Sequence, residues 1–258
     1  DRADRKREIE RELRADIQAG FRGFSLVFQP IVNPERRIIG AESLIRWSRQ
    51  DGTTVSPAVF IPVAEEMGLI QQLGVWTLYT AARAMVAWEA DNGPHGRKLR
   101  QLSVNVSAVQ FAQQDLPERV NDLVRAAGLS PERMKLEVTE TAAMSDPDAS
   151  LATMQKIRDR GFRISIDDFG TGYSSLAYLQ RFPIDQLKID RSLVQDVHLP
   201  DAERDRGIVR GVVAICQNLG GGITSLAEGV ESAEQMRTLL DLGIGELQGY
   251  YLSRPVPA

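Results

Sequence analysis

The sequence predicts an α/β fold in which strands and helices alternate within one domain. Short segments rich in β-branched and aromatic residues recur between amphipathic helical stretches, a pattern typical of a parallel sheet covered by helices. The 258 residues are enough for an α/β barrel, and polar side chains recur at the carboxyl ends of the predicted strands. Eight such strands would close into a (β/α)₈ barrel. A doubly wound open sheet remains the alternative, because periodicity does not separate the two.

Residues 1–20 predict a charged helix ahead of the barrel. Twelve of these residues are charged, and Ile9, Leu13 and Ile17 form an apolar stripe with a spacing of four. A helix packed on the domain and a connector from an upstream domain both fit this pattern. Because the sequence begins with Asp1 and not with Met, the connector interpretation implies a longer polypeptide. We therefore expect a connector helix over residues 1–20 and a barrel domain over residues 21–258.

The elements of the barrel follow in order along the chain. The predicted strands are Ser25–Val32, Ile38–Trp47, Leu102–Ser107, Met134–Thr139, Arg163–Asp167, Gln186–Asp190, Ile223–Ala227 and Glu246–Leu252. The predicted helices are Pro57–Leu73, Trp76–Ala90, Pro117–Ala127, Ala149–Arg160, Arg204–Leu219 and Ala233–Leu242. In the fifth of these helices, the only cysteine, Cys216, falls on the apolar face and is expected in the core.

Composition excludes several classes of protein. The net charge is −4 with no long basic run, so binding to DNA or RNA is not expected. No apolar stretch approaches the ~20 residues of a membrane span, and no signal peptide opens the sequence. We expect a cytoplasmic domain, with membrane tethering through regions outside this sequence left open. A single cysteine excludes an internal disulfide.

Carboxylates and amides at strand ends are the informative feature. They are Glu42, Asn105, Glu137, Asp167, Asp168, Asp190, Glu228 and Gln248. Any one acid could be paired with a lysine, but leaving the whole set unpaired near an apolar centre would cost several kcal/mol each. We therefore expect the acids to gather around bound cations.

The ligand types narrow the choice of metal. Oxygen ligands suit Mg²⁺, Mn²⁺ or Ca²⁺. The only histidines, His95 and His198, lie away from the predicted strands, so neither a zinc or haem site nor a Ser/His/Asp arrangement is expected. Adjacent side chains point to opposite sides of a strand, so Asp167 and Asp168 at a strand end could reach two metals. Two ions ~4 Å apart form a clamp for attack on a phosphodiester.

Strand alternation also predicts where two cationic side chains, those of Arg46 and Lys188, lie. Glu42, Leu44 and Arg46 share one face of their strand, which would bring a guanidinium near a metal-bound phosphate. Lys188 and Asp190 also share a face, which would place an ammonium among the acids. The glycine-rich residues 168–176 are interpreted as a mobile loop beside the metals, because their spacing does not complete a nucleotide fingerprint.

The polar residues lie in motifs that, in their order along the chain, resemble those of the EAL family of cyclic di-GMP phosphodiesterases. The motifs are Phe28-Gln29-Pro30-Ile31, Glu42-Ser43-Leu44-Ile45-Arg46, Phe60-Ile61-Pro62-Val63-Ala64-Glu65, Val104-Asn105-Val106-Ser107, Leu136-Glu137-Val138-Thr139-Glu140, Asp167-Asp168-Phe169-Gly170-Thr171-Gly172-Tyr173-Ser174-Ser175-Leu176, Leu187-Lys188-Ile189-Asp190-Arg191-Ser192, Ala227-Glu228-Gly229-Val230-Glu231 and Gln248-Gly249-Tyr250. The matches extend from about Phe24 to Pro257, so the resemblance covers nearly the whole chain.

The resemblance implies a modified TIM (β/α)₈ barrel whose first strand is antiparallel to the others, with the active site at the C-terminal mouth. It also implies hydrolysis of cyclic di-GMP to linear pGpG with two divalent cations, Mg²⁺ or Mn²⁺, and inhibition by Ca²⁺. A homodimer and an upstream sensory or GGDEF-type domain are expected on the same ground. The alternative is a catalytically silent EAL domain that binds cyclic di-GMP as a receptor or transmits a signal.

The resemblance further implies a role for each site residue. One metal would be held by Glu42, Asn105, Glu137 and Asp167, and the second by Asp167, Asp168 and Glu228. Lys188 would act on the attacking water with support from Asp190, and Glu140 would anchor the glycine-rich loop. The dinucleotide would be contacted by Gln29, Arg46 and Tyr250, in a pocket lined by Gln248 and Glu231. Two departures stand out. Ser43 replaces the family's alanine, and residues 220–225 form a longer stretch before Glu228.

Overall fold

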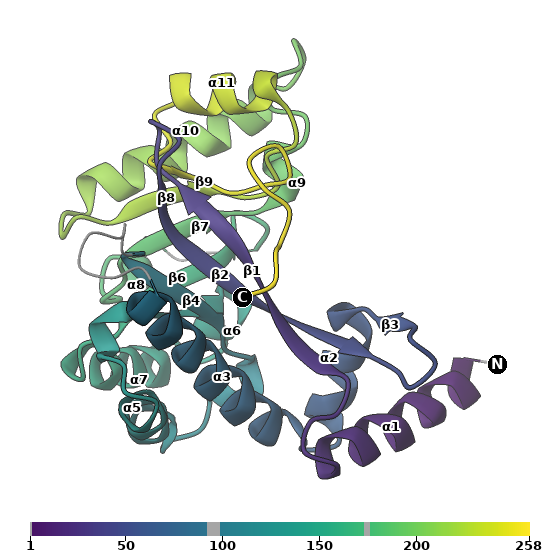
Figure 1. Ribbon diagram of the computed structural model, residues 1–258. Helices are drawn as coiled ribbons and strands as arrows, with labels where there is room; N and C mark the ends of the chain where they lie inside the picture. The colour runs from purple at the N-terminus through teal and green to yellow at the C-terminus, as the bar shows by residue number, and fades with distance from the viewer. Residues whose placement is uncertain (1, 92–98, 173–175) are drawn as a thin grey trace.

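The computed structural model of the chain describes residues 2–91, 99–172 and 176–258 (Figure 1). His95 and the loop residues Tyr173, Ser174 and Ser175, which the sequence analysis singled out, lie outside this part of the chain.

The strands close into a barrel, which rules out the doubly wound open sheet. The sheet has the order β1-β9-β8-β7-β6-β5-β4-β2, and β1 also pairs with β2. The barrel strands are β1 (Phe24–Val32), β2 (Ile38–Ser48), β4 (Gln101–Asn105), β5 (Met134–Thr139), β6 (Arg163–Phe169), β7 (Gln186–Ile189), β8 (Thr224–Ala227) and β9 (Glu246–Leu247), and β3 (Thr54–Val55) extends β2 outside the barrel.

The first strand runs against the rest, which confirms the modified TIM barrel. β1 and β2 are antiparallel, with Gln29 opposite Glu42. Only a short turn joins β1 to β2, and such a connection permits an antiparallel pair but not a parallel one. The successive pairs from β2 to β9 are parallel around the barrel. Their carboxyl ends therefore meet at one mouth.

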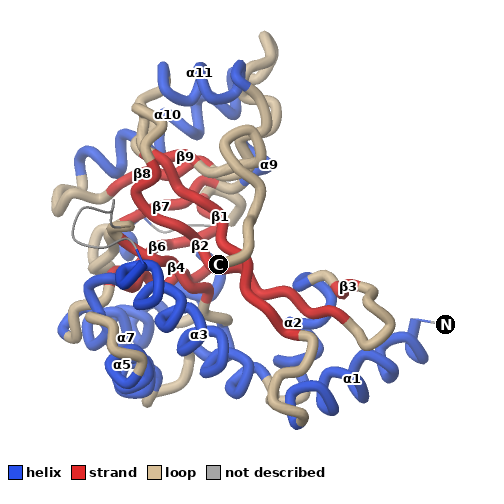
Figure 2. Tube along the Cα trace, viewed as in Figure 1, coloured by secondary structure: helices blue, strands red, loops and turns tan. Residues whose placement is uncertain are grey.

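Helices surround the strands (Figure 2). They are α1 (Arg2–Gln18), α2 (Pro57–Glu66), α3 (Ile70–Asp91), α4 (Ala108–Phe111), α5 (Leu116–Ala126), α6 (Glu140–Ser145), α7 (Pro147–Asp159), α8 (Leu176–Leu179), α9 (Arg191–Val194), α10 (Glu203–Asn218) and α11 (Ala233–Asp241). One helix boundary was predicted wrongly. The expected helix Pro57–Leu73 is interrupted at Gly68, whose φ of 69° ends α2, and Ile70 then begins a single helix that includes the expected Trp76–Ala90.

The last strand is shorter than predicted, because the chain turns after Leu247 instead of continuing to Leu252. The Gln248 carbonyl accepts a hydrogen bond from Val230 N, and the Val230 carbonyl accepts one from Tyr251 N. Gly249 lies so close to this backbone that a Cβ would stand 2.1 Å from the Val230 oxygen. Only glycine fits there, and the turn carries Gln248 and Tyr250 to the barrel mouth.

The apolar stripe of α1 packs on the domain. Ile9, Leu13 and Ile17 are buried in a cluster with Trp47 and Phe60. Asp16, beside this stripe, is buried as well and accepts a hydrogen bond of 3.0 Å from Trp47 Nε1. The helix is thus attached to β2, whereas its role as a connector stays a prediction. The main core lies between the barrel and its other helices and contains Cys216, as expected. Within residues 2–91, 99–172 and 176–258, no helix combines the length and apolar character of a membrane span.

Candidate active site

The barrel mouth gathers the acids that the sequence places at strand ends. Glu42 of β2, Glu137 of β5 and Asp167 of β6 are buried there, and Glu228 follows β8 directly. The Glu228 backbone N–H donates to Ile189 O of β7 at 3.1 Å. This bond holds the residue at the barrel end despite the long glycine-rich stretch before β8.

Lys188 of β7 lies at the centre of these acids with a fully buried side chain. Its Nζ is 2.6 Å from a carboxylate oxygen of Glu137, 2.6 Å from one of Glu228, 3.1 Å from one of Asp167 and 3.6 Å from one of Glu42. One ammonium therefore faces four carboxylates, which leaves an excess of negative charge. Such an excess in a buried site requires bound protons or further cations.

The pKa values of these groups show how the charge is shared. Burial raises the pKa of Glu137 to about 7 and that of Glu228 to about 8, even though Lys188 acts in the opposite direction. Burial and the charge of Asp167 raise the pKa of Asp168. For Glu42, burial is outweighed by Lys188 and by hydrogen bonds from Gln248 and Asn105, so its pKa is lowered. Burial alone would lower the pKa of Lys188, but the surrounding carboxylates raise it well above its ordinary value.

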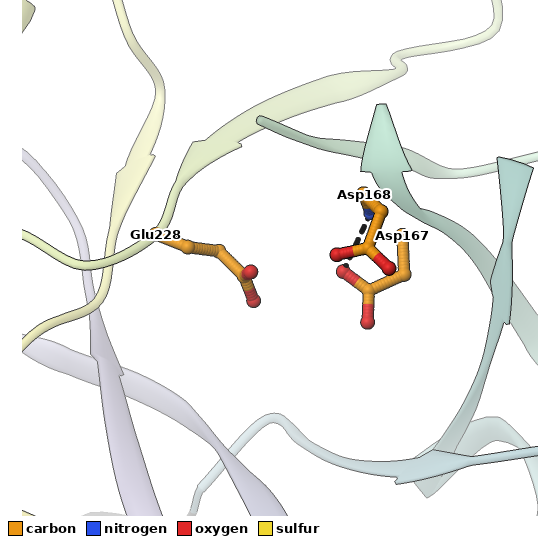
Figure 3. Close-up of side chains that lie close together, drawn as sticks. All are labelled: Asp167, Asp168 and Glu228. Atoms are coloured by element: carbon orange, nitrogen blue, oxygen red, sulfur yellow. Dashed lines mark hydrogen bonds between the residues drawn. The ribbon is translucent and has the colours of Figure 1, made fainter. Parts of the chain in front are cut away.

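Among the described residues, Asp167, Asp168 and Glu228 form a close group of possible metal ligands. One oxygen from each lies within 4.8 Å of the others, and Figure 3 shows the two aspartates side by side, facing Glu228. Simple strand alternation would direct the aspartates to opposite sides. The structure differs because Asp168 has a left-handed φ of 56° and the register shifts between Ile166 and Phe169. This bulge turns both carboxylates to one side.

The residues present fit a divalent cation. The donors are carboxylate oxygens, as Mg²⁺, Mn²⁺ and Ca²⁺ prefer. Among the described residues, Glu137 Oε1 is buried without a hydrogen-bond partner, although its other oxygen is held by Lys188. An unpaired buried oxygen is costly, and a cation would satisfy it.

Two cavities meet at Leu44 of β2, and the smaller one is lined by acids of the barrel mouth. One has a volume of about 270 Å³ and is lined by Gln29, Glu42, Leu44, Asp167, Arg191, Glu228, Gly229, Glu231, Gln248, Gly249 and Tyr250. The other, of about 370 Å³, contains Arg46 and Asn105 and is bordered by α2 and α3 through Ile61 and Leu73. An extended ligand could thus reach from the acids past Leu44 into the larger cavity.

Comparison with known proteins identifies the family. A profile of the EAL domain matches residues 10–255. The chain belongs to the EAL domain family. It is 42% identical over 234 residues to the bifunctional diguanylate cyclase/cyclic di-GMP phosphodiesterase MucR of Pseudomonas aeruginosa, covering 90% of this chain and 33% of MucR. It is 35% identical over 257 residues to the cyclic di-GMP phosphodiesterase NbdA of the same species, covering 99% of this chain and 32% of NbdA.

A solved structure agrees with these matches. The PaMucR phosphodiesterase in complex with c-di-GMP is 40% identical and superimposes with a TM-score of 0.89, covering 97% of this chain and 98% of that one. The chain spans about a third of the length of the curated relatives MucR and NbdA.

The glycine-rich loop of this EAL domain is tied to Glu140, the residue predicted to anchor it. Glu140 is buried at the start of α6, and its Oε2 accepts a hydrogen bond of 2.9 Å from Gly170 N. A Cβ on Gly172 would stand 2.8 Å from the other carboxylate oxygen. The backbone at Gly170 and Gly172 therefore lies directly on the Glu140 side chain.

Other predicted residues have their own partners. Asp190 caps α9, where its Oδ1 accepts a hydrogen bond of 2.9 Å from Ser192 N. The predicted support of Lys188 by Asp190 therefore stays a prediction. The negative charge of Asp190 also helps to raise the pKa of Asp168. Arg46 is half-buried and donates to its neighbour, Ile45 O. Glu231 forms an exposed ion pair of 2.8 Å with Arg191.

Sequence reasoning assigned no role to two features. Arg191 is the one cationic residue among the described residues that line the smaller cavity, and it follows the Lys188–Asp190 motif directly. A second polar layer lies below the acids, where Ser165 Oγ donates to Gln186 Oε1 and Gln186 Nε2 donates to Glu246 Oε2, with buried Lys135 one strand away on β5. Counting back two residues from Glu137, Asp167 and Lys188 would have found Lys135, Ser165 and Gln186.

Proposed function

We propose that this EAL domain is a divalent-metal-dependent phosphodiesterase that hydrolyses cyclic di-GMP to linear pGpG. The observation that carries the proposal is the buried group of carboxylates around Lys188, with Asp167, Asp168 and Glu228 close enough to share a cation. MucR and NbdA, both named as cyclic di-GMP phosphodiesterases, are similar over most of this chain, which supports the same substrate.

In this proposal Glu42, Asn105, Glu137 and Asp167 hold one cation, and Asp167, Asp168 and Glu228 hold the second. Divalent cations supply Lewis-acid polarisation of the phosphodiester and acidify water. In this proposal the ammonium of Lys188, held among its carboxylate partners, orients the water that attacks phosphorus. As the water oxygen bonds to phosphorus, the P–O3′ bond breaks, O3′ takes up the proton that the water loses and becomes a hydroxyl, and the phosphate stays on the 5′ side of pGpG.

The other side chains bind and orient the substrate. Gln29, Gln248 and Tyr250 line the smaller cavity, and Arg46 lines the larger one. Because the two cavities meet at Leu44, one base of an extended dinucleotide fits in each of them. Glu140 holds the loop after Asp168 by its bond to Gly170 N, and so limits how far that metal ligand can move.

Further domains outside this chain are proposed from its relatives. MucR is named as a bifunctional cyclase and phosphodiesterase, and this chain covers 33% of it. An upstream sensory or GGDEF-type domain is therefore proposed for the longer protein, with α1 as the connector. Homodimerisation, cytoplasmic location and membrane tethering through other regions stay predictions of the sequence.

The decisive experiment is incubation with cyclic di-GMP and Mg²⁺ or Mn²⁺, followed by chromatography for pGpG. We expect pGpG with either ion, and none after chelation or in Ca²⁺. A matched Glu42→Gln variant keeps the shape of the side chain but loses the charge of a metal ligand, and should be inactive. Binding of cyclic di-GMP by calorimetry without any pGpG would instead indicate the receptor alternative.

A further inference from the structure

The end of the chain completes the barrel beside the active site. β9 is so short that Val32 and Leu247 form its one register pair with β1. Further along β1, Phe28 N donates to Val256 O at 2.7 Å and Val256 N donates to Phe28 O at 2.9 Å. In Figure 1 this yellow segment runs next to β1 and ends near β2. Residues 253–256, here called the C-terminal strap, thus occupy an edge of β1 that β9 leaves open.

The strap fixes a chain of side-chain amides that ends at a proposed metal ligand. Gln29 Nε2 donates to the strap carbonyl, Ser253 O, at 3.2 Å. Gln248 Nε2 donates to Gln29 Oε1 at 3.1 Å and to Glu42 Oε2 at 2.8 Å. A backbone carbonyl can only accept, so Ser253 O sets the orientation of the Gln29 amide, which in turn sets that of Gln248.

This chain of hydrogen bonds leaves one acceptor, Gln248 Oε1, without a hydrogen-bond partner among the described residues. Because the Gln248 nitrogen serves both Gln29 and Glu42, its Oε1 is left over, and it is buried without a partner among the described residues. If the Gln29 amide were free to rotate, Gln248 could turn its oxygen toward Gln29 and withdraw this acceptor. The strap carbonyl, acting through Gln29, and the Glu42 carboxylate, which can only accept, together prevent that exchange.

The strap also holds an aromatic side chain at the cavity. The Arg254 guanidinium lies over the Tyr250 ring, 4.6 Å from its centroid, within the range of a cation–π contact. Tyr250 is half-exposed at 50% and lines the same cavity as Gln29. Without Arg254 the exposed ring would be free to change rotamer. Two side chains of the substrate cavity thus depend on neighbouring strap residues.

We propose that the C-terminal strap is a positioning element, which orders Gln29, Gln248 and Tyr250 for substrate through Ser253 O and Arg254. The substrate's identity rests on the function proposed above. The strap contacts the proposed ligand-binding residues Gln29 and Tyr250 directly and reaches Glu42 only through Gln248, while Asn105 holds the other Glu42 oxygen. It should therefore act mainly on substrate affinity and change the chemical step less.

The test compares two variants of Val256. Val256→Pro removes the N–H that donates to Phe28 O and releases the strap, whereas Val256→Thr keeps both the N–H and the branched shape as a matched control. One hydrogen bond is worth up to ~1.5 kcal/mol, so we expect Val256→Pro to raise KM, and the Kd measured in Ca²⁺, about tenfold. The same variant should change kcat less than about threefold. Equal KM and Kd values in the two variants would overturn the proposal.

A double-mutant cycle separates positioning from general loosening. If the strap acts through the amide chain, Val256→Pro should add no more than about threefold to the KM of Gln29→Ala, because the Gln29 side chain is already gone and only the contact of Arg254 with Tyr250 remains to be lost. Full additivity would show that the strap only supports the barrel. Arg254→Ala changes an exposed side chain, so it should fold normally, and should raise KM about threefold through Tyr250; an unchanged KM would remove Tyr250 from the proposal.

A readout without ligand distinguishes failure of the strap from failure of the proposed function. The Gln29 side-chain amide protons, observed by NMR, should be protected from exchange in the Val256→Thr variant and lose that protection in Val256→Pro. If cyclic di-GMP is neither bound nor hydrolysed by the unaltered protein, the proposed function fails while this comparison still decides the strap. Equal protection in both variants would refute the strap under any function.

Discussion

Lys188→Met offers the sharpest test of the charge balance in the barrel mouth. The substitution keeps a long side chain but removes the ammonium that lies within 3.6 Å of Glu42, Glu137, Asp167 and Glu228. Removing one partner from a buried ion pair typically costs ~3–5 kcal/mol. In a domain of this size each kcal/mol lowers Tm by ~2–4 °C. The metal-free variant should therefore melt roughly 6–20 °C below the unaltered protein.

Divalent cations should reverse much of this loss, because they neutralise the same carboxylates. We expect Mn²⁺ or Mg²⁺ to raise the Tm of Lys188→Met more than that of the unaltered protein, in thermal melts with and without chelator. Turnover should nevertheless fall about 10²-fold or more, the scale of a lost proton-handling group, while the Kd for cyclic di-GMP in Ca²⁺ changes little.

Lys135→Met is the matched control. Lys135 is buried on β5 as well, but burial lowers its pKa, whereas the carboxylates raise that of Lys188. Its loss should therefore cost less stability and show no rescue by metal. Normal metal-free stability of Lys188→Met, or equal rescue of both variants by Mn²⁺, would refute the assignment of Lys188 as the counter-ion of the acids. Normal turnover would show that the lysine is structural only.

Three other predictions concern the neighbouring residues. Glu42→Ala should abolish pGpG formation. Ser43→Ala should keep pGpG formation and lower stability by about 1 kcal/mol, because it loses the hydrogen bond from Ser43 Oγ to Ser103 O. Equal loss of activity in the two variants would contradict the opposite directions of the two side chains. Glu140→Ala should lower kcat several-fold at saturating Mn²⁺ by freeing Gly170 N, and an unchanged kcat would show that the loop needs no anchor. The metal-free domain should lose stability as pH rises from about 4.5 to 8. In the folded protein Glu137 and Glu228 have pKa values of about 7 and about 8, so over this range they keep protons that the unfolded chain has already released. Saturating Mg²⁺ should remove this pH dependence, and a flat metal-free profile in thermal melts would be inconsistent with these pKa values.

The barrel itself was predictable because each of its signals is local. Strands such as Met134–Thr139 combine apolar runs with flanking turns, and the structure reproduces that strand as predicted. The gathering of Glu42, Glu137, Asp167 and Glu228 also follows from sequence, because carboxyl ends of parallel strands meet at one mouth of any closed barrel. Alternation within a strand then orders the layers, as for Lys188 above Gln186.

What sequence patterns missed depends on backbone geometry and on contacts between distant segments. The αL conformation of Asp168 cancels the strand alternation that separates it from Asp167, yet a positive φ is uncommon even for aspartate, so strand pattern alone does not predict it. The end of β9 is set by Gly249 lying against the Val230 backbone, and the Asp190 carboxylate is taken by the first turn of α9.

The same limitation explains why the amide chain could not be foreseen, and what it adds to the site. Gln29 and Ser253 are 224 residues apart, and Gln248 and Glu42 are 206 apart, so no spacing rule joins them. Yet their hydrogen bonds leave Glu42 with both oxygens engaged, Oε1 by Asn105 and Oε2 by Gln248, while Glu137 keeps one oxygen unpaired. Glu42 is thereby held in one orientation before any cation arrives, whereas Glu137 offers a free oxygen. A cation entering this mouth should therefore find a rigid ligand on the β2 side and an open one on β5, with Lys188 between them.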